Sequence, residues 1–539
     1  MFEILVADAL AAEGLAILKA QTDVKLSVQE KWAPGELAAA LGKFDGVIIR
    51  SAVNIKGPEL AHPGKLRVIA RAGVGVDNVD VEAATKAGVL VMNTPDANTI
   101  TTAEHAIALM MALSRKIPLA DASLRAGKWD RKTFMGAQLA GKTLGIIGFG
   151  RIGKAVAKRC LAMDMKVVAY DKFYFAQTAL DGQVNMIKDM EALLPLCDYI
   201  SIHTPGGETL LGAAQIAKCK KGVRFVNAAR GGLIDEVALA EAIKSGQVAG
   251  AAIDVYEPEP PAMDKEIFKL GDKVVVTPHL GASTKEAQTT AATDVVAGIL
   301  TYLRGEGLVG AVNAGGVEVN LSAQEQAYAD LAQRMGTILA AIADKGFDSI
   351  TLRTNGEQPK RIAGTLQRLA VMALIKPFLT ESVNVVNAFH LAESRGIALR
   401  SETMGQAVQR AIQHSIELEI TEKIDGAPET KTHTIIGTVF ADNLPRVLGI
   451  KGYWMDMVPA GPMVLIVNKD RPGVIGLVGT TFGKLGINIA DMTISRKGDK
   501  ALMLLNVDSE PSAEALAILR SEPALETVKS IKLPALANS

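Results

Sequence analysis

The chain has 539 residues, and its 58 lysines and arginines balance its 58 aspartates and glutamates. At about 100–200 residues per domain, this length predicts three or four domains. Zero net charge argues against a general nucleic-acid binder and against a protein held on acidic membranes by basic residues. Apolar residues make up 49% of the chain, aromatic residues only 4%, and the mean hydropathy is +0.21. This composition argues against disorder and favours an Ala/Gly/Val-rich α/β protein.

The sequence carries no clear targeting or redox signal. No apolar run approaches the roughly 18–20 residues that span a bilayer, and no basic region precedes an apolar one at the N-terminus. Cys160, Cys197 and Cys219 form neither a disulfide framework nor a metal-ligand spacing. We therefore expect a cytoplasmic protein with reduced thiols and without a metal.

The N-terminal part alternates short β-rich runs with helical stretches. The runs cover residues 4–7, 46–50, 67–71 and 88–92. This βαβ rhythm is typical of a parallel sheet. A single long, buried helix is predicted next, over Thr99–Arg115.

A second βαβ series begins at Lys142. Its short apolar runs are bounded by Gly, Asp or Pro, which is typical of strands buried on both faces. The runs are TLGIIGFG, KVVAYD, CDYISIHTP, GVRFVNAAR, GQVAGAAIDVY and DKVVVTPH. After His279 the pattern becomes helical over Thr284–Arg304 and then breaks in the Gly-rich segment 305–316.

The C-terminal part shows two further patterns. Periodicity predicts helices over Ala323–Lys345 and Ile362–Ser394 and a strand over Thr432–Phe440. After Gly461-Pro462 the order becomes strand, helix, strand, strand, helix, strand. That order is the ferredoxin-like arrangement.

A G-x-G-x-x-G motif at residues 148–153 closes one predicted strand and opens a helix. Its glycines allow a tight turn and close approach of the backbone to a pyrophosphate, and the helix N-terminus favours that anion. Arg151 stands at the mouth of the turn, within reach of the pyrophosphate. Asp171 ends the next strand, where its carboxylate accepts ribose hydroxyls and repels a 2′-phosphate. The motif therefore favours NAD over NADP; the alternative is a Gly-rich turn that only packs two elements.

Three later stretches end predicted strands, where ligands bind in open α/β sheets. They are VNAARGG at 226–232, DVYEPEP at 254–260 and TPHLGAST at 277–284. Oxidation of a 2-hydroxy acid requires an arginine for the carboxylate, a base for the hydroxyl proton and a carboxylate that orients the base. Arg230, His279 and Glu259 fit these roles. Each taken alone is as readily a surface arginine, a helix-cap histidine or a loop carboxylate.

Together these motifs resemble the D-isomer-specific 2-hydroxyacid dehydrogenase family over roughly residues 1–314. The resemblance implies that Arg230, Glu259 and His279 form the catalytic set, and that residues 1–98 and 281–314 fold together. The loop that begins at His203 is shorter than the family's usual pattern. The cofactor contacts expected from motif and resemblance are Gly148, Gly150, Arg151, Ile152, Gly153, Asp171, Thr204, Pro205, Ala228, Ala229, Asp254 and Gly281.

The N-terminal part of the sequence narrows the range of expected substrates. Arg50 and Arg71 follow predicted strands beside a glycine turn, a setting suited to a phosphate or carboxylate; ordinary turn chemistry is the alternative. RAGVGVDNVD and the stretch from WDRKTF onward are similar to long-form family members that act on 3-phosphoglycerate. Val74 stands where relatives often have threonine. The similarity implies substrate contacts at Arg50, Ser51, Arg71, Gly73 and Asn98, and at Arg131 across a dimer interface.

The last eighty or so residues resemble an ACT domain, a small amino-acid-binding module. The matching stretches are NKDRPGV, followed by a helix, and GINI. The resemblance implies paired ACT domains, hence a homodimer or homotetramer, with serine as effector held by Asn468, Asp470 and Asn488. The alternative is a domain that only dimerises. The middle region resembles the extra domain of the long-form enzymes, with an assembly or regulatory role.

The expected fold is α/β: a flavodoxin-like substrate domain and a Rossmann NAD-binding domain, then an α+β intervening domain and a ferredoxin-like ACT domain. The expected boundaries are 1–98 and 281–314 for the substrate domain, 99–280 for the NAD-binding domain, 315–458 for the intervening domain and 459–539 for the ACT domain. The expected activity is oxidation of 3-phosphoglycerate to 3-phosphooxypyruvate with NAD, at the start of L-serine biosynthesis and under serine control.

Two alternatives stay open. One is a reductase of glyoxylate, hydroxypyruvate or 2-oxoglutarate, against which the long C-terminal extension argues. The other is a non-catalytic NAD-sensing corepressor, against which the set Arg230, Glu259 and His279 argues. No nucleic-acid or membrane partner is expected.

Overall fold

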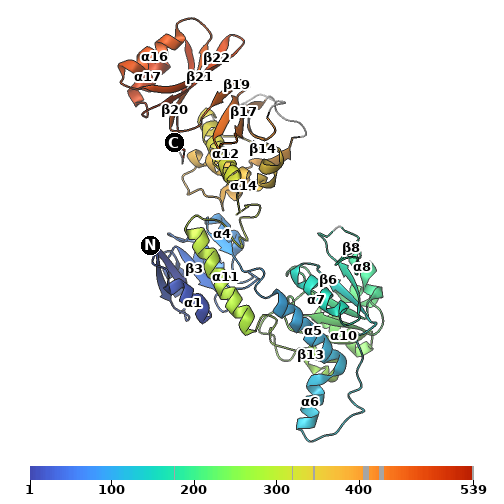
Figure 1. The fold of residues 1–539 in the computed structure, drawn as a ribbon. Helices are drawn as coiled ribbons and strands as arrows, with labels where there is room; N and C mark the ends of the chain where they lie inside the picture. The colour runs from blue at the N-terminus through green and yellow to red at the C-terminus, as the bar shows by residue number, and fades with distance from the viewer. Residues whose placement is uncertain (175, 319, 344–345, 405–411, 424–429, 537–539) are drawn as a thin grey trace.

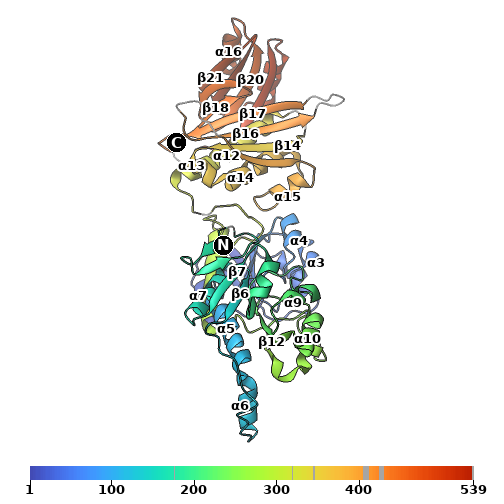
Figure 2. The ribbon, with the colours of Figure 1, turned by 90° about the vertical axis from the view of Figure 1, so that its right-hand side faces the viewer.

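The computed structural model describes residues 1–539 except 175, 319, 344–345, 405–411, 424–429 and 537–539. The chain forms an elongated molecule with four sheets (Figures 1 and 2). The two N-terminal sheets lie at one end and the two C-terminal sheets at the other. Within the described part of the chain, no helix is long and apolar enough to cross a membrane.

The first sheet has five parallel strands in the order β2-β1-β3-β4-β5. Its strands are β1 (Phe2–Val6), β2 (Val24–Val28), β3 (Gly46–Ile49), β4 (Val68–Arg71) and β5 (Leu90–Met92). Its helices are α1 (Ala12–Lys19), α2 (Glu36–Leu41), α3 (Gly57–Leu60), α4 (Val81–Lys86) and the returning α11 (Lys285–Leu303). Val295 and Ile299 of α11 pack in one core with Ile4 and Val68, so a segment far along the chain completes this unit.

The second sheet has eight strands in the order β13-β12-β11-β10-β6-β7-β9-β8, all parallel except β8. The strands are β6 (Thr143–Ile147), β7 (Lys166–Tyr170), β8 (Thr178–Ala179), β9 (Val184–Met186), β10 (Tyr199–Ile202), β11 (Val223–Asn227), β12 (Val248–Ile253) and β13 (Val274–Val276). The helices are α5 (Thr99–Arg115), α6 (Ile117–Arg125), α7 (Arg151–Leu161), α8 (Met190–Leu193), α9 (Ala213–Lys218) and α10 (Glu236–Ser245). Helix α5 confirms the predicted helix, and both parallel sheets confirm the predicted Rossmann-like class.

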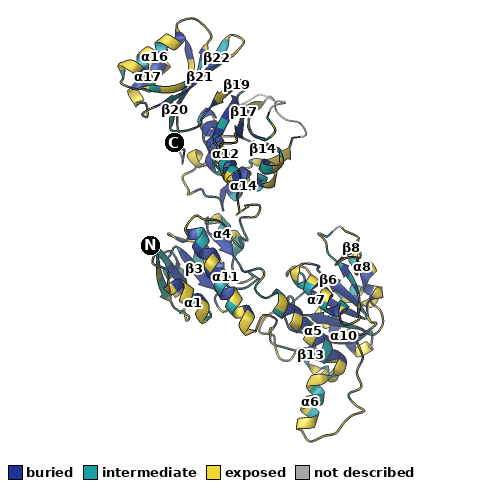
Figure 3. Ribbon diagram, in the orientation of Figure 1, coloured by how far each residue is buried: buried dark blue, intermediate teal, exposed yellow. Residues whose placement is uncertain are grey.

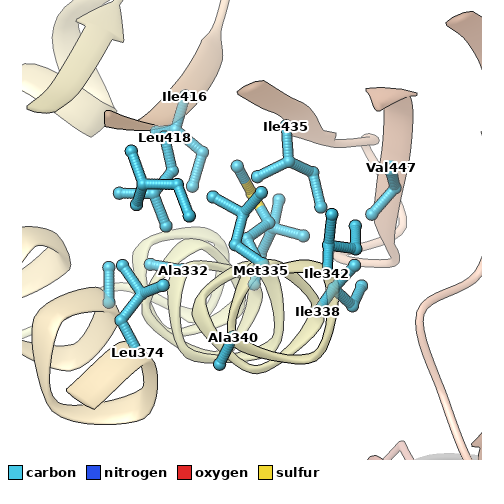
Figure 4. Close-up of a cluster of buried hydrophobic side chains, with 14 of the residues drawn as sticks. Ala332, Met335, Ile338, Ala340, Ile342, Leu374, Ile416, Leu418, Ile435 and Val447 are labelled. Atoms are coloured by element: carbon cyan, nitrogen blue, oxygen red, sulfur yellow. The ribbon is translucent and has the colours of Figure 1, made fainter. Parts of the chain in front are cut away.

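The third sheet has six strands in the order β15-β14-β16-β17-β18-β19. The strands are β14 (Ser349–Asn355), β15 (Ala398–Thr403), β16 (Ser415–Lys423), β17 (Thr430–Val439), β18 (Pro445–Ile450) and β19 (Tyr453–Met457), and the helices are α12 (Ala323–Ile342), α13 (Glu357–Arg361), α14 (Ala363–Ile375) and α15 (Ala388–Glu393). Figure 4 shows α12 at the centre of the core, with Met335 and Ile338 facing Ile435 and Val447 of the sheet.

The predicted helix over Ile362–Ser394 is wrong as a continuous element. A 3₁₀ turn around Pro377 ends α14, because proline lacks the N–H that the next helical turn needs. The side chains of Asn384 and Asn387 then hydrogen-bond the local backbone and hold a loop before α15. The helix expected over Ala323–Lys345 is α12, and residues 344–345 lie outside the described part of the chain.

The fourth sheet confirms the predicted ferredoxin-like order. It consists of β20 (Pro462–Lys469), β21 (Ile489–Lys497), β22 (Lys500–Val507) and β23 (Leu525–Lys532), with α16 (Val474–Lys484) and α17 (Ala513–Ser521) between strands, in the order β21-β22-β20-β23. One face packs on its own helices, and the other joins the core around α12 through Met463, Leu465 and Ile531. The buried Arg334 of α12 donates to the carbonyls of Pro459 and Pro534, which fixes both ends of this unit.

The loop before α15 attaches the C-terminal half to the first sheet. Val386 is buried in the core of the first sheet, and Asn384 Nδ2 donates to the carbonyl oxygen of Gly88, 2.8 Å away. Arg368 donates to the carbonyl of Gly315, on the segment that links the two halves, and to the carbonyl of Val385 in this loop. The central strands of the sheets are buried, whereas the edge strand β15 is largely exposed and α6 projects with no buried residue (Figure 3).

Candidate active site

The glycine motif forms the turn between β6 and α7. Gly148 has φ +93°, and a Cβ there would lie 2.6 Å from the carbonyl oxygen of His203. A Cβ at Gly153 would lie 2.2 Å from the carbonyl oxygen of Gly148, so helix and strand approach too closely for a side chain. Gly150 precedes α7, whose first N–H groups have no intrahelical partner. The turn therefore offers backbone donors and a positive helix end to an anion.

The carboxylate of Asp171, just after β7, holds this turn. It accepts from the backbone N–H of Phe149 at 2.7 Å and of Phe173 at 2.8 Å. Thr204 follows β10 beside the turn, and its buried hydroxyl has no hydrogen-bond partner among the described residues. These features fit a dinucleotide. Arg151 is exposed and pairs with Asp96 at 2.6 Å, beside the segment that joins the two sheets.

His279 and Glu259 form a direct pair. His279 Nδ1 lies 2.7 Å from Glu259 Oε2, and Glu259 Oε1 accepts from the backbone N–H of Tyr256 at 2.9 Å. Because Nδ1 faces the carboxylate, Nε2 is the ring nitrogen left for a substrate. The imidazole is 46% exposed, so a substrate can reach it. This arrangement suits a base that an acid orients.

Asp254 organises the loop that carries His279. Its carboxylate is fully buried and accepts from the Thr277 hydroxyl at 2.5 Å and from the backbone N–H of Leu280 and Gly281 at 2.8 Å each. His279 itself has φ +54°, in the left-handed region, so the loop must hold it there.

His105 of α5 lies 3.2 Å from Asp254. Burial on its own raises the pKa of Asp254, but the hydrogen bonds from His105, Thr277 and Leu280 outweigh it, and the pKa is lowered. The carboxylate is therefore ionised at neutral pH. Within the chain, Asp254 is therefore the charged acceptor that fixes the loop at 277–281.

Arg230 reaches from the second sheet to the first. Its Nε donates to Asp77 Oδ2 at 3.1 Å, and its Nη1 donates to the carbonyl oxygen of Ala229 at 2.7 Å. A Cβ at Gly75 would lie 1.9 Å from Arg230 Nη2, so the guanidinium lies directly over the glycine turn that follows β4. The loop after Pro205 covers the aliphatic part of the same side chain at Gly206.

Arg71 lies in the same electrostatic environment. Burial, together with the positive charges of Arg230 and Arg50, lowers the pKa of Arg71 against the opposing effect of Asp77. Its Nη1 would meet a Cβ at Gly73 at 2.1 Å, which explains the glycine there. Several buried polar atoms of this region have no hydrogen-bond partner among the described residues: Arg71 Nε, Thr94 Oγ1, Asn98 Oδ1 and Thr99 Oγ1. Such donors and acceptors fit an anionic ligand.

The remaining expected substrate residues lie apart from this cluster or on its edge. The backbone N–H of Arg50 donates to Asp8, and its guanidinium is 3.4 Å from the carbonyl oxygen of Ala9. Ser51 is exposed. Arg131 is exposed in the segment after α6, which projects away from the first sheet of the same chain (Figure 1).

Sequence reasoning missed Asp8, Asp77 and His105. Asp8 accepts the N–H groups of Arg50 and Ala52, Asp77 pairs with Arg230, and His105 pairs with Asp254. Asp8 and Asp77 share one signal, since each follows a strand of a parallel sheet. His203 follows β10, and burial lowers its pKa to about 4.

The effector candidates do not gather at one place in the fourth sheet: Asn468 and Asp470 lie at one end of the sheet, and Asn488 lies at the other. Asn468 is buried, and its Oδ1 has no hydrogen-bond partner within the described residues. Asp470 lies 3.4 Å from Arg496, and Asn488 Nδ2 donates to Asp508 Oδ2 at 2.9 Å. Asp470 precedes α16 and Asn488 follows it, while Asn468 is the next-to-last residue of β20.

Three family models match successive parts of the chain. They are the NAD binding domain of D-isomer specific 2-hydroxyacid dehydrogenases over residues 107–281, the D-3-phosphoglycerate dehydrogenase intervening domain over 325–451, and the ACT domain over 463–524. The first match contains the glycine turn, Arg230, Glu259 and His279. The chain is thus an NAD-dependent oxidoreductase of the 2-hydroxyacid type.

The chain is similar to curated proteins over nearly its whole length. It is 39% identical to D-3-phosphoglycerate dehydrogenase of Archaeoglobus fulgidus, over 95% of this chain and 97% of that protein, and 37% identical to the one of Bacillus subtilis, over 99% and 100%. Among solved structures, the TT0316 protein of Thermus thermophilus matches with a TM-score of 0.53 at 33% identity, over 57% of this chain and 99% of that one. The chain belongs to the D-3-phosphoglycerate dehydrogenase family.

Proposed function

We propose that the chain oxidises D-3-phosphoglycerate at C2 to 3-phosphooxypyruvate, the first step of L-serine biosynthesis. Family membership over nearly the full chain supports this activity. The single observation that carries it is the His279–Glu259 pair, at 2.7 Å. Glu259 follows β12 and His279 follows β13, in the same sheet as β11, which precedes Arg230. This reaction requires a base that a carboxylate orients, and an arginine that binds the substrate carboxylate through two hydrogen bonds.

The geometry supports a separate role for each residue. Arg230 holds the substrate carboxylate through its outer guanidinium edge, while Arg71 and Arg50 supply charge for the phosphate. His279 accepts the C2 hydroxyl proton at Nε2, and Glu259 stabilises the imidazolium that forms. NAD, held by the glycine turn, Asp171 and Thr204, supplies the hydride acceptor. Asp254 keeps the loop of His279 in place.

The projecting arm at 117–136 supports an assembly of two copies. It exposes large apolar side chains: Ile117 and Leu124 on α6, which has no buried residue, and Trp129 and Met135 in the segment after α6. Such a patch marks an interaction site. We propose that a second copy covers it and that Arg131 of one copy then contributes to the other copy's substrate site, in a homodimer or homotetramer.

The fourth sheet supports regulation by an amino acid. Asn468 offers a buried oxygen that has no hydrogen-bond partner among the described residues, and Asp470 lies at the same end of α16, whereas Asn488 lies at its other end. We propose that serine binds at these three residues in paired ACT domains. The cytoplasmic location expected from the sequence stays a prediction.

A substrate panel tests the activity. Purified enzyme is mixed with NAD and 3-phosphoglycerate, and in separate reactions with NADH and glyoxylate, hydroxypyruvate or 2-oxoglutarate. We expect NADH formation from 3-phosphoglycerate at a kcat/KM well above that of any of the reductions, and inhibition by serine. Turnover only in the reductions would contradict the proposal, and no turnover with any substrate would favour a non-catalytic NAD sensor. Serine without effect on rate or binding would leave the ACT unit structural.

A further inference from the structure

The ion pair between Arg230 and Asp77 joins the two N-terminal sheets. Arg230 follows β11 of the second sheet, and Asp77 lies between β4 and α4 of the first sheet, 153 positions earlier. The Arg230 side chain is 31% exposed and that of Asp77 is 70% exposed. The pair therefore lies where a substrate that bridges the two sheets would enter.

The described residues occupy only part of the Arg230 guanidinium. Nε donates to Asp77 Oδ2, and one proton of Nη1 goes to the Ala229 carbonyl. A guanidinium has five N–H donors in a planar fork, so Nη2 and the second Nη1 proton are left over. These form the outer edge of the fork, the edge that binds a carboxylate in bidentate fashion. Nη2 lies over Gly75, where no side chain intervenes.

The loop that carries Asp77 is itself fixed. Asn78, the next residue, donates from Nδ2 to the carbonyl oxygens of Arg50 and Val53, at 2.7 and 2.6 Å. Asp77 is thus tied to the turn that carries Arg50, and a long arginine side chain gains a fixed partner. Without this partner, Arg230 would keep only its bond to Ala229, within its own loop.

We propose that Asp77 is a positioning residue: it holds Arg230 by Nε so that the outer guanidinium edge faces the substrate carboxylate above Gly75. The inference rests on the proposed function, because it assigns Asp77 to the site that binds a 2-hydroxy acid. It also predicts that Asp77 does not compete with substrate, because the two carboxylates use different edges of one guanidinium.

The test combines kinetics with a double-mutant cycle. The variants are Asp77→Asn, Asp77→Ala, Arg230→Lys and Asp77→Ala/Arg230→Lys. The matched control is Glu82→Gln, which breaks an exposed carboxylate–lysine pair with Lys86 on the neighbouring α4. For each protein, kcat, the KM for 3-phosphoglycerate, the KM for NAD and the thermal unfolding midpoint are measured.

We expect Asp77→Ala to lower kcat/KM for 3-phosphoglycerate on the order of tenfold, as for an exposed charge-assisted bond. Asp77→Asn keeps a hydrogen-bond acceptor, so its kcat/KM should fall less. For both variants, the KM for NAD and the unfolding midpoint should stay unchanged. In the Arg230→Lys background, Asp77→Ala should lower kcat/KM by less than a further twofold, because the two residues act as one unit. Glu82→Gln should match the wild type.

Three results would overturn the proposal. A rise in kcat/KM on loss of Asp77 would show that its carboxylate competes with substrate. Equal losses in both backgrounds would show an action independent of Arg230. Wild-type kinetics for Asp77→Ala would show no role. If the wild type does not oxidise 3-phosphoglycerate but turns over another 2-hydroxy acid, the proposed substrate fails, and the same cycle run with that acid still tests Asp77, because every such acid carries the carboxylate.

Discussion

Replacement of Asp254 by asparagine tests how the loop of the proposed base is held. In the structure, Thr277 Oγ1, Leu280 N and His105 Nε2 lie 2.5, 2.8 and 3.2 Å from Oδ1, and Gly281 N lies 2.8 Å from Oδ2. An asparagine with its oxygen at the Oδ1 position keeps three of these donors. Its NH₂ group would then face the Gly281 N–H, so two donors would meet at a site with no exposure to water.

The cost can be worked from these contacts. A hydrogen bond to a charged group contributes about 1.5–3 kcal/mol, and a buried N–H without a partner costs about 1–3 kcal/mol. We therefore expect Asp254→Asn to lower the free energy of unfolding of the NAD-binding part by about 3–5 kcal/mol. Because Gly281 is two residues from His279, the left-handed backbone of His279 should relax, and kcat should fall at least tenfold.

The assay is NADH formation at saturating 3-phosphoglycerate and NAD, together with denaturant unfolding followed by circular dichroism. Asp272→Asn is the matched control, since Asp272 pairs with Lys116 on the surface and is 53% exposed. If Asp254→Asn keeps wild-type kcat and stability, the carboxylate does not hold the loop, and this reasoning is refuted.

Three further predictions concern the base, the pH dependence and the regulatory half. Glu259→Gln keeps an acceptor for the Tyr256 N–H but removes the charge beside His279, so kcat should fall on the order of tenfold or more while the KM for NAD stays constant; unchanged kcat would contradict the acid-oriented base. The Arg361 guanidinium chiefly, with Ser322, lowers the pKa of the buried Glu325 to about 2. A carboxylate with a depressed pKa stabilises the fold above its unfolded value of about 4.3 and loses that contribution as pH falls toward 2. Glu325→Gln should therefore lower the unfolding free energy by up to about 3 kcal/mol at pH 7, and this difference should shrink as the pH falls from about 4.3 toward 2 in denaturant titrations; a difference independent of pH would refute the ionic account. Arg334→Met removes the guanidinium donors to the carbonyls of residues 459 and 534–535, so hydrogen exchange in β20 and β23 should accelerate by about tenfold or more; unchanged protection would show that the apolar contacts alone hold the ACT unit.

Local motifs carried most of what the sequence could predict. The glycine turn, the strands that carry Arg230, Glu259 and His279, and the helix over Thr99–Arg115 all lie in short, continuous stretches. Hydrophobic periodicity and turn residues determine such elements over ten to twenty positions. The ferredoxin-like order near the C-terminus was predictable for the same reason.

Contacts between distant segments were not predictable in this way. Asp77 and Arg230 are 153 positions apart, and no local pattern distinguishes Asp77 from an ordinary turn aspartate. The same holds for His105, which meets Asp254 only when α5 packs on the second sheet. The loop at 384–387 reads as helical in periodicity because Val385 and Val386 are apolar, yet these side chains pack on a different sheet.

The most direct test of the central claim compares wild type with His279→Ala in a single-turnover experiment. Enzyme in excess over NAD is mixed with 3-phosphoglycerate, and NADH formation is followed in time. No NADH is present at the start, so reduction of a 2-oxo acid cannot contribute to the signal. Separate titrations establish that both proteins bind NAD equally. The account predicts rapid NADH formation by the wild type and a rate at least a hundredfold lower for His279→Ala. Equal rates for the two proteins, or no NADH from the wild type, would contradict it.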